Sequence, residues 1–280
     1  VFYCRLLADH VGLALDILSD IMWDPAIRPA DVDAERTVIL DEILMHADEP
    51  ADLVAERWTA ALFPGHPLGR DVLGSPDTVA AISGPQIRSF FEHHYRPGNV
   101  VISAAGDCRH EELADAIEAR FAGSLGGSNP EREPLVHPAD PLVVVRRPTE
   151  QAHLVLGTRS VSRFDEQRWA HAVLNHVLGG GMSSRLFQKV REQRGLAYSI
   201  YSERAGYEDT GSMGVVVGTA PENVDEVLRI VTGELDLLAE EGITPRELAV
   251  AKGNLRADSL LACEDSGARM SRVGAGLLLH

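Results

Sequence analysis

Cysteine is scarce in this chain of 280 residues, which contains only Cys4, Cys108 and Cys263. No two of them form a Cys-x-x-Cys pair, so the sequence offers neither a thiolate metal site nor the disulfide framework of a small secreted domain. Three scattered thiols fit a reducing compartment best, and we predict that they are small buried hydrophobic residues.

Positive charge and long apolar runs are scarce as well. Lys and Arg number 26 against 42 Asp and Glu, which gives a formal net charge of −16, and only Lys189 and Lys252 are lysines. Nucleic-acid binding needs a basic face that displaces counterions from phosphates, so this balance excludes that class of protein. No apolar run reaches the ~18 residues that span a bilayer, and we expect a cytoplasmic protein without a membrane partner.

The chain also lacks any pair of histidines at the spacing of a zinc-binding helix. It contains neither His-Glu-x-x-His nor the inverted His-x-x-Glu-His. His171 and His176 are five residues apart and so do not lie on one helix face. His93 and His94 are adjacent, so their side chains point apart on a helix. We therefore interpret these histidines as surface or core residues. No Ser-His-Asp or Cys-His set can be assembled from spacing alone.

The most informative stretch that is present is the predicted helix at residues 29–46. Asp31 or Asp33 would cap its start, and apolar residues recur along it at helical spacing. Glu35 and Glu42 lie seven residues, or two turns, apart, so both carboxylates project from nearly the same face. Like charges stacked in this way repel mildly unless a cation or donor lies between them, and the simplest interpretation is a solvated acidic face.

The length favours two domains, and hydrophobic periodicity predicts further elements in both halves. Asp77 and Ser83 are predicted to cap two short helices. A stretch rich in Gly, Ser and Pro over residues 124–141 is the predicted linker between domains at residues 1–123 and 142–280. The other predicted strands are 2–7, 99–105, 142–146, 153–158, 196–202 and 210–218, and the other predicted helices are 9–22, 51–63, 111–121, 166–178, 185–194, 224–238 and 245–263.

The two halves repeat one another in pattern, as a strand–helix–helix unit in each. Residues 244–248 match residues 28–32, and this register places Ala251 opposite Glu35. A merely solvated face gives no reason for an alanine to interrupt the carboxylates in one copy only. The repeat therefore indicates two similar α+β domains, of which the first alone carries the acidic pair.

A glycine run, Gly179-Gly180-Gly181, precedes Ser183-Ser184 and invites comparison with a phosphate-binding loop. It follows a predicted helix rather than a strand and lacks the lysine of a P-loop, so a helix C-cap and turn explains it better. Arg185, Arg191 and Arg194 lie on the next predicted helix, and such charged faces are usually only solvated.

Several motifs are spread along the chain: Ala34–Ile43, Asp48–Pro50, His66–Gly69 with Leu73-Gly74, Tyr95–Asn99, and Gly179–Phe187 running into Val190–Glu192 and Arg194–Ser199. Together they resemble the pitrilysin/insulinase zinc metallopeptidases, and most closely their mitochondrial-processing-peptidase-like bacterial branch. The stretches occur in the family's order and span nearly the whole chain, which makes the resemblance specific.

The resemblance implies a Zn²⁺ cofactor. In the family an HxxEH motif supplies two histidine ligands and a water-activating glutamate, and a later glutamate, which falls on Glu42, is the third ligand. Glu35 matches a carboxylate that orients a ligand or tunes the site. Because only 41 residues precede Glu42, we expect the HxxEH helix before residue 1. The chain would then be an internal fragment that is inactive alone.

The resemblance also implies a second domain that does not bind zinc. Residues 172–176 would be the counterpart of HxxEH, with the first His and the Glu replaced. Arg191 and Tyr198 match an arginine and a tyrosine that contact the substrate backbone. Both are donors that would help to stabilise the oxyanion of peptide hydrolysis.

The implied fold class is α+β, with two homologous domains that are each a mostly antiparallel sheet packed with helices. Residues 1–123 would be the remainder of the catalytic domain and residues 142–280 the non-catalytic one, closing like a clamshell around a peptide or unfolded polypeptide. The implied function is that of a zinc-dependent metalloendopeptidase. Two alternatives stay open: a non-catalytic partner subunit of the same family, and an acidic α+β interaction protein. Pairing with itself or with a sister subunit also stays open.

Overall fold

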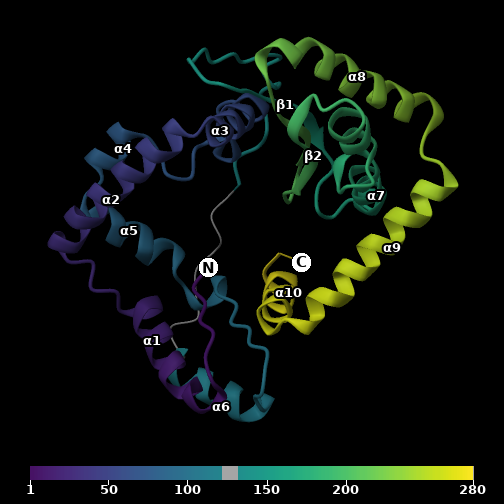
Figure 1. Cartoon of the computed structure of the whole chain (residues 1–280). Coiled ribbons are helices and arrows are strands. Elements are labelled where there is room, and N and C mark those ends of the chain that lie inside the picture. Colours follow the sequence, from purple (N-terminus) through teal and green to yellow (C-terminus); the bar gives the residue numbers. More distant parts are fainter. Residues whose placement is uncertain (122–131, 280) are drawn as a thin grey trace. The chain divides into compact units, whose positions relative to one another are not determined.

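The computed structural model describes residues 1–121 and 132–279 (Figure 1). It divides into two compact units, the first formed by segments 1–41, 75–132 and 258–280, and the second by segments 42–74 and 133–257. Residues 124–131 of the predicted linker lie outside the described residues. The predicted domain boundaries at 123 and 142 stay a prediction.

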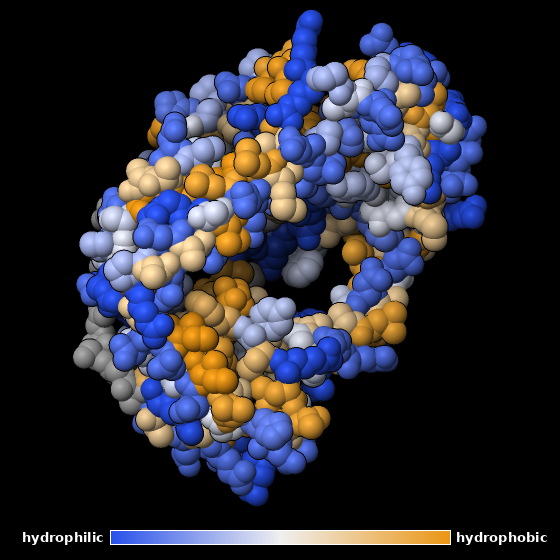
Figure 2. Space-filling view, turned by 60° about the vertical axis from the view of Figure 1, so that its left-hand side comes forward, coloured by the Kyte–Doolittle hydropathy of each residue, from blue (hydrophilic) through white to orange (hydrophobic). Residues whose placement is uncertain are grey.

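The regular elements of the first unit are all helices among its described residues. Helix α1 packs against α6, where the rings of Trp23 and Phe121 meet edge to face at 6.0 Å. Leu15 and Val79 are its buried apolar side chains within the described part, and many other apolar residues stay exposed, as the orange areas of Figure 2 illustrate. Its elements are η1 (Ala8–His10), α1 (Val11–Trp23), the start of α2 (Pro29–Asp48), α4 (Pro76–Ala81), α5 (Gly84–His94), η3 (Pro97–Asn99), α6 (His110–Phe121), η6 (Ala262–Glu264) and α10 (Ser266–Leu279).

Three predicted strands are wrong. Residues 2–7, 99–105 and 142–146 do not form strands, although their Val- and Ile-rich sequences favour an extended backbone. A strand needs a neighbour with which to exchange N–H and C=O hydrogen bonds, and the described part of the chain pairs none with these segments. The extended tendency was visible in the sequence, but the pairing is a property of the whole fold.

Smaller predictions need correction too. The three cysteines are exposed rather than buried. Helix α2 already begins at Pro29, so Asp31 lies in its first turn and does not cap the end. A carboxylate at that position interacts favourably with the helix dipole. Ser75, not Asp77, is the N-cap of α4, whereas the predicted cap Ser83 is confirmed by its capping box on α5.

The second unit contains a three-stranded antiparallel sheet in the order β1-β3-β2, which confirms the three strands predicted after residue 150. The strands are β1 (Ala152–Ser160), β2 (Ala197–Gly206) and β3 (Gly211–Thr219). The remaining elements are the end of α2, α3 (Pro50–Leu62), η2 (Pro67–Gly69), α7 (Arg168–Gly179), η4 (Phe187–Glu192), η5 (Pro221–Asn223), α8 (Val224–Glu241) and α9 (Pro245–Leu261). None of the helices in the described residues is long and apolar enough to cross a bilayer.

One face of this sheet carries the core of the unit. Val215 and Val217 of β3 and Ile200 of β2 are buried there against apolar residues of α8 and η4. The opposite face holds α3 through a glycine pair: Gly157 and Gly214 are direct cross-strand partners beneath the indole of Trp58. A Cβ at Gly157 would lie 2.8 Å from that ring, so the indole can approach the sheet only because both positions lack a side chain.

Helix α7 ends where the glycine run begins. Its C-cap is Gly180, which supports the C-cap interpretation of the run. Asn175 and Ser202 fix the helix to β2 reciprocally, since the Ser202 hydroxyl donates to the Asn175 carbonyl at 2.9 Å and the Asn175 amide donates to the Ser202 carbonyl at 3.3 Å. The glycine turn is therefore held at a fixed place beside β2.

Candidate functional site

Tyr198 owes its exposure to a β-bulge at the start of β2. The pairing with β3 skips it, because the register shifts between Ala197 and Ser199. In strict alternation Tyr198 would share the buried face of the sheet with Ile200. The extra residue instead turns Ala197 inward and leaves Tyr198 with 79% of its surface exposed. Bulges of this kind re-aim side chains and are common beside active sites.

Arg191 lies on a second irregularity, the π-helical segment η4. The sequence predicted an ordinary helix over residues 185–194, but the Gln193 N–H donates to the Gln188 carbonyl five residues earlier, at 3.0 Å. The segment ends at Glu192, and Gly195, three residues later, has a φ of 60° in the left-handed region that glycine adopts most easily. Single π-helical turns are rare and often occur at functional sites.

These two irregularities bring Arg191 and Tyr198 together. The guanidinium carbon of Arg191 lies 5.4 Å from the centroid of the Tyr198 ring and 4.9 Å from that of Phe187. Cation–π contacts of this kind hold the cation over the faces of the two rings. The guanidinium carries five N–H donors, which can bind an oxygen acceptor. Among the described residues the guanidinium donates no hydrogen bond.

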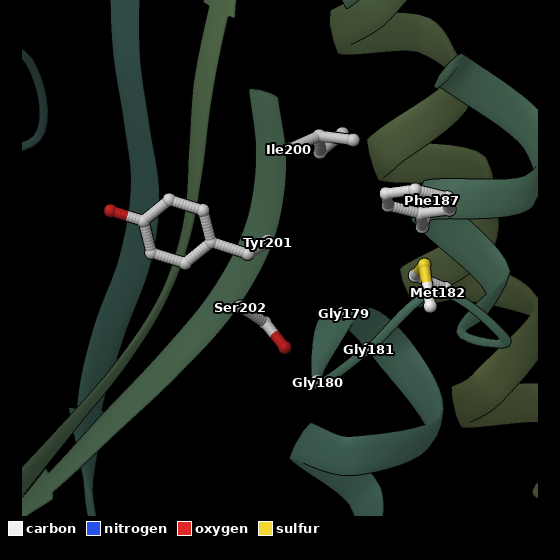
Figure 3. Close-up of a pocket in the computed structure, with 8 residues that line it drawn as sticks. All are labelled: Gly179, Gly180, Gly181, Met182, Phe187, Ile200, Tyr201 and Ser202. Carbon is white, nitrogen blue, oxygen red and sulfur yellow. The ribbon is translucent and has the colours of Figure 1, made fainter. Parts of the chain in front are cut away.

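An open pocket of about 380 Å³ adjoins this pair. Phe187 belongs to both, because its ring supports Arg191 and also lines the pocket. Figure 3 shows the side chain of Ile200 directed towards Phe187, and that of Tyr201 directed to the other side of β2. The lining residues are Gly179, Gly180, Gly181, Met182, Phe187, Ile200, Tyr201 and Ser202. Part of the wall is thus bare glycine backbone, which allows close approach of another chain.

The sequence suggested that the neighbouring arginines are only solvated, but in the structure Arg185 and Arg194 have hydrogen-bond partners. Arg185 makes a bidentate ion pair with Glu247 at the start of α9, with N···O distances of 2.6 and 2.9 Å. Its hydrogen bonds lower the pKa of the Glu247 carboxyl from 4.5 to about 2, with a further contribution from Thr244. Arg194 donates to the Lys189 carbonyl at 2.9 Å. Arg185 thus ties the residues just before η4 to α9, and Arg194 binds a carbonyl within η4 itself.

Glu35 and Glu42 lie on α2, which confirms the predicted helix around them. Both side chains are exposed, and neither makes a hydrogen bond or ion pair within the described part of the chain. No group of three or more His, Cys, Asp or Glu side chains in that part is placed to hold a metal ion. A catalytic zinc takes three protein ligands, so an unpaired carboxylate such as Glu42 fits one of these positions and leaves two to other residues.

The counterpart region in the second unit has a different chemistry. His176 Nε2 lies 3.1 Å from the Asn254 amide nitrogen of α9, and His171 Nδ1 lies 3.0 Å from the Ser160 hydroxyl. Ala251, which the repeat places opposite Glu35, is 1% exposed and belongs to the core. Both histidines thus have hydrogen-bond partners, and the second copy buries an apolar side chain at the position of the first acidic residue.

Phe187 is the member of the site that sequence reasoning missed. It precedes Arg191 by four residues, a spacing at which side chains meet on a helix. That spacing was the available signal. The bulge at Tyr198 had no comparable signal, because it depends on the pairing with β3.

Comparison with known proteins gives consistent matches. The family description "Peptidase M16 inactive domain" matches residues 81–255, and "Insulinase (Peptidase family M16)" matches residues 1–76. An uncharacterized zinc protease of Streptomyces coelicolor is 43% identical over 98% of this chain and 61% of its own length. An uncharacterized zinc protease of Bacillus subtilis is 34% identical over 99% of this chain and 68% of its own length. The chain thus spans less than two thirds of the Streptomyces relative.

Solved structures show the same fold. A peptidase M16 inactive domain from Pseudomonas fluorescens superposes with a TM-score of 0.89 and 24% identity over 97% of this chain and 65% of that one. A protease from Helicobacter pylori gives 0.87 with 20% identity over 98% and 68%. A chain of complex III₂ from Candida albicans gives 0.80 with 19% identity over 98% and 68%. These likenesses confirm the predicted α+β fold of helices and antiparallel sheet.

Proposed function

The chain belongs to the insulinase family of peptidases, family M16, and we propose that the whole protein is a zinc metalloendopeptidase to which this chain contributes substrate contacts and one metal ligand. The observation that carries the proposal is the pair of Arg191 and Tyr198. Their stacking at 5.4 Å joins a guanidinium to a phenol on an exposed surface. The names of several relatives, which are called zinc proteases, also support the proposal.

The pair is suited to bind a peptide backbone. Arg191 offers donors in the plane of its guanidinium, and Tyr198 offers a phenolic O–H. When a peptide carbonyl becomes tetrahedral its oxygen gains negative charge, and donors that are already in place stabilise that charge more than the ground-state carbonyl. The face contacts with Phe187 and Tyr198 keep the guanidinium in place before the substrate arrives. The substrate would be a peptide or unfolded polypeptide.

Glu42 would hold the Zn²⁺ together with two ligands that the described residues do not provide, and Glu35, two turns earlier on α2, would orient the ligands or water around it. When bound, the zinc supplies a Lewis acid that lowers the pKa of its water. The free, exposed state of both carboxylates supports this assignment. Cytoplasmic location is part of the same proposal, because three exposed free thiols persist best where thiols are kept reduced.

A second candidate is a non-catalytic partner subunit, paired with a sister chain or with itself. Two observations favour it. The larger of the two family matches is to an inactive domain, and one structural likeness is to a chain of complex III₂. The two candidates differ in what the whole protein does with zinc and with peptides, since a partner subunit alone would bind no catalytic zinc and cleave nothing. An acidic α+β interaction protein would behave in the same way.

The test is hydrolysis of a quenched fluorescent peptide by the whole protein and its variants. Arg191→Ala and Tyr198→Phe should lower kcat by roughly tenfold or more while the zinc content is retained, because each removes an oxyanion donor. Tyr207→Phe is the matched control, since Tyr207 does not line the pocket and its ring packs against Phe63. Equal activity of all three variants and the parent would refute the role of the pair.

A further inference from the structure

An ion pair between a partly exposed lysine and a buried glutamate joins the π-helical turn that carries Arg191 to α8. The Lys189 ammonium, on η4, is bonded to the Glu234 carboxylate, on α8. Glu234 is 4% exposed. Its second carboxylate oxygen makes no hydrogen bond to the described residues, and the nearest further cation is Arg185 at 4.0 Å. The carboxylate therefore depends on Lys189 for its main compensation.

Position 234 is a place for an apolar side chain. The buried residues of α8 are Val227, Ile230, Val231 and Glu234, at the spacing of one helix face that packs into the core. Replacing a buried ion pair by apolar residues of similar volume is often neutral or stabilising. Stability alone therefore gives little reason for a glutamate here. Buried polar groups specify a geometry in some proteins, and the buried carboxylate of Glu234 can do so here through its bond to Lys189.

The geometry that this ion pair can specify is the π-helical hydrogen-bond pattern of η4. Leu186 and Val190 anchor the segment by apolar burial, which is not directional and tolerates rotation of the helix. A charge-assisted hydrogen bond is directional, and it is placed on Lys189, two residues before Arg191. If the turn relaxed to an α-helix, each residue after the change would rotate around the axis, and Arg191 would leave the face of Tyr198.

We propose that Lys189 and Glu234 are positioning residues, which hold the turn so that the Arg191 guanidinium stays over the rings of Phe187 and Tyr198. The consequence for peptide cleavage rests on the proposed function of Arg191. The positioning itself is a property of this unit and can be measured without substrate.

The decisive variant is the double substitution Lys189→Met/Glu234→Leu. It leaves no unpaired charge. Leucine suits the buried face of α8, and methionine keeps most of the apolar stem of the partly exposed Lys189, so the protein should unfold at a denaturant concentration close to that of the parent. The readout is the side-chain Nε–Hε NMR signal of Arg191 in the whole protein, assigned by its loss in Arg191→Ala. Stacking on two rings should shift this signal upfield in the parent, and the double variant should lose that shift.

Arg229→Met/Glu226→Leu is the matched control. This pair is also on α8, with an N···O distance of 3.4 Å, but both side chains are exposed. Neither residue belongs to η4. The Arg191 signal should be unchanged in it. Lys189→Met alone leaves Glu234 buried without its cation and is expected to lose stability, so the double variant carries the test.

An unchanged Arg191 signal in the folded double variant would overturn the proposal. If the shift is lost, kcat of the whole protein should fall about tenfold with little change in KM, because the displaced donor acts in the transition state. A lost shift with unchanged hydrolysis would support the positioning and refute the role of Arg191 in the proposed function. The two ideas can therefore fail separately.

Discussion

The ion pair between Arg185 and Glu247 should make the stability of the second unit depend on acid pH. Glu247→Gln is the perturbation, and it is a clean one. The carboxylate lies at the third position of a capping box in which its oxygen accepts from the Thr244 N–H at 2.7 Å, and glutamine can keep that bond. What the substitution removes is the charge that the bidentate guanidinium of Arg185 binds.

The magnitude follows from the lowered pKa. Arg185 is the largest cause that lowers the pKa of Glu247 from 4.5 to about 2. At 1.36 kcal/mol per pKa unit this corresponds to an upper figure of about 3 kcal/mol. The Glu247 side chain is 27% exposed, so water screens part of the attraction, and about 1–2 kcal/mol is the expected contribution near neutral pH.

The sign is that of a carboxylate with a depressed folded-state pKa. Its contribution to stability is fully present above the unfolded pKa of 4.5 and is lost as the pH falls through the folded value of about 2. The difference in unfolding free energy between parent and Glu247→Gln should therefore be largest near neutral pH and fall to roughly half near pH 3. Urea unfolding of both proteins at the two pH values measures it.

A difference of zero near neutral pH, or one that grows on acidification, would refute this reasoning. Glu240→Gln is the matched control, because Glu240 is an exposed carboxylate near the end of α8. It should change stability little at either pH, since exposed charges contribute on the order of 0–1 kcal/mol.

Two further predictions concern packing. Gly157→Ala should destabilise the protein by about 1–3 kcal/mol in urea unfolding, because its Cβ would lie 2.6 Å from the Met213 carbonyl oxygen and 2.8 Å from the ring of Trp58. Gly253→Ala, at a helical position with open space around it, should stabilise by about 0.5–1 kcal/mol. A loss of equal size at both glycines would contradict the close contacts at Gly157. Phe187→Leu should lower kcat/KM of the whole protein roughly threefold with zinc retained, since it removes one of the two rings beneath Arg191. Unchanged kinetics would show that the Tyr198 ring suffices.

The regular elements of the second unit were largely predictable because their signals are local. Strands 153–158, 196–202 and 210–218 carry their own β-favouring residues, and α8 shows its apolar stripe in the sequence. The strands predicted at 2–7 and elsewhere failed for the opposite reason. Their composition favours an extended chain, but a ladder requires a partner, and no stretch of sequence states which partner it will have.

The site itself was predictable only in part. Its residues Arg191 and Tyr198 stood out through a family resemblance, and periodicity alone would have left the arginine on a solvated face. What brings them together is one extra residue in each of two elements, the π turn of η4 and the bulge of β2. Both depart from a regular period and depend on contacts with other elements, such as Lys189 with Glu234. Such departures cannot be read from the local sequence.

The central claim, that this chain is part of a zinc peptidase with Glu42 as a ligand, is tested most directly by the zinc content of the whole protein. The parent should contain close to one zinc per molecule and cleave a peptide, and Glu42→Gln should lose most of both, because an amide is a poor replacement for a carboxylate ligand. Asp41→Asn, at the adjacent exposed residue of α2, should retain both. A parent without zinc, or a Glu42→Gln variant with full zinc content and activity, would contradict the claim.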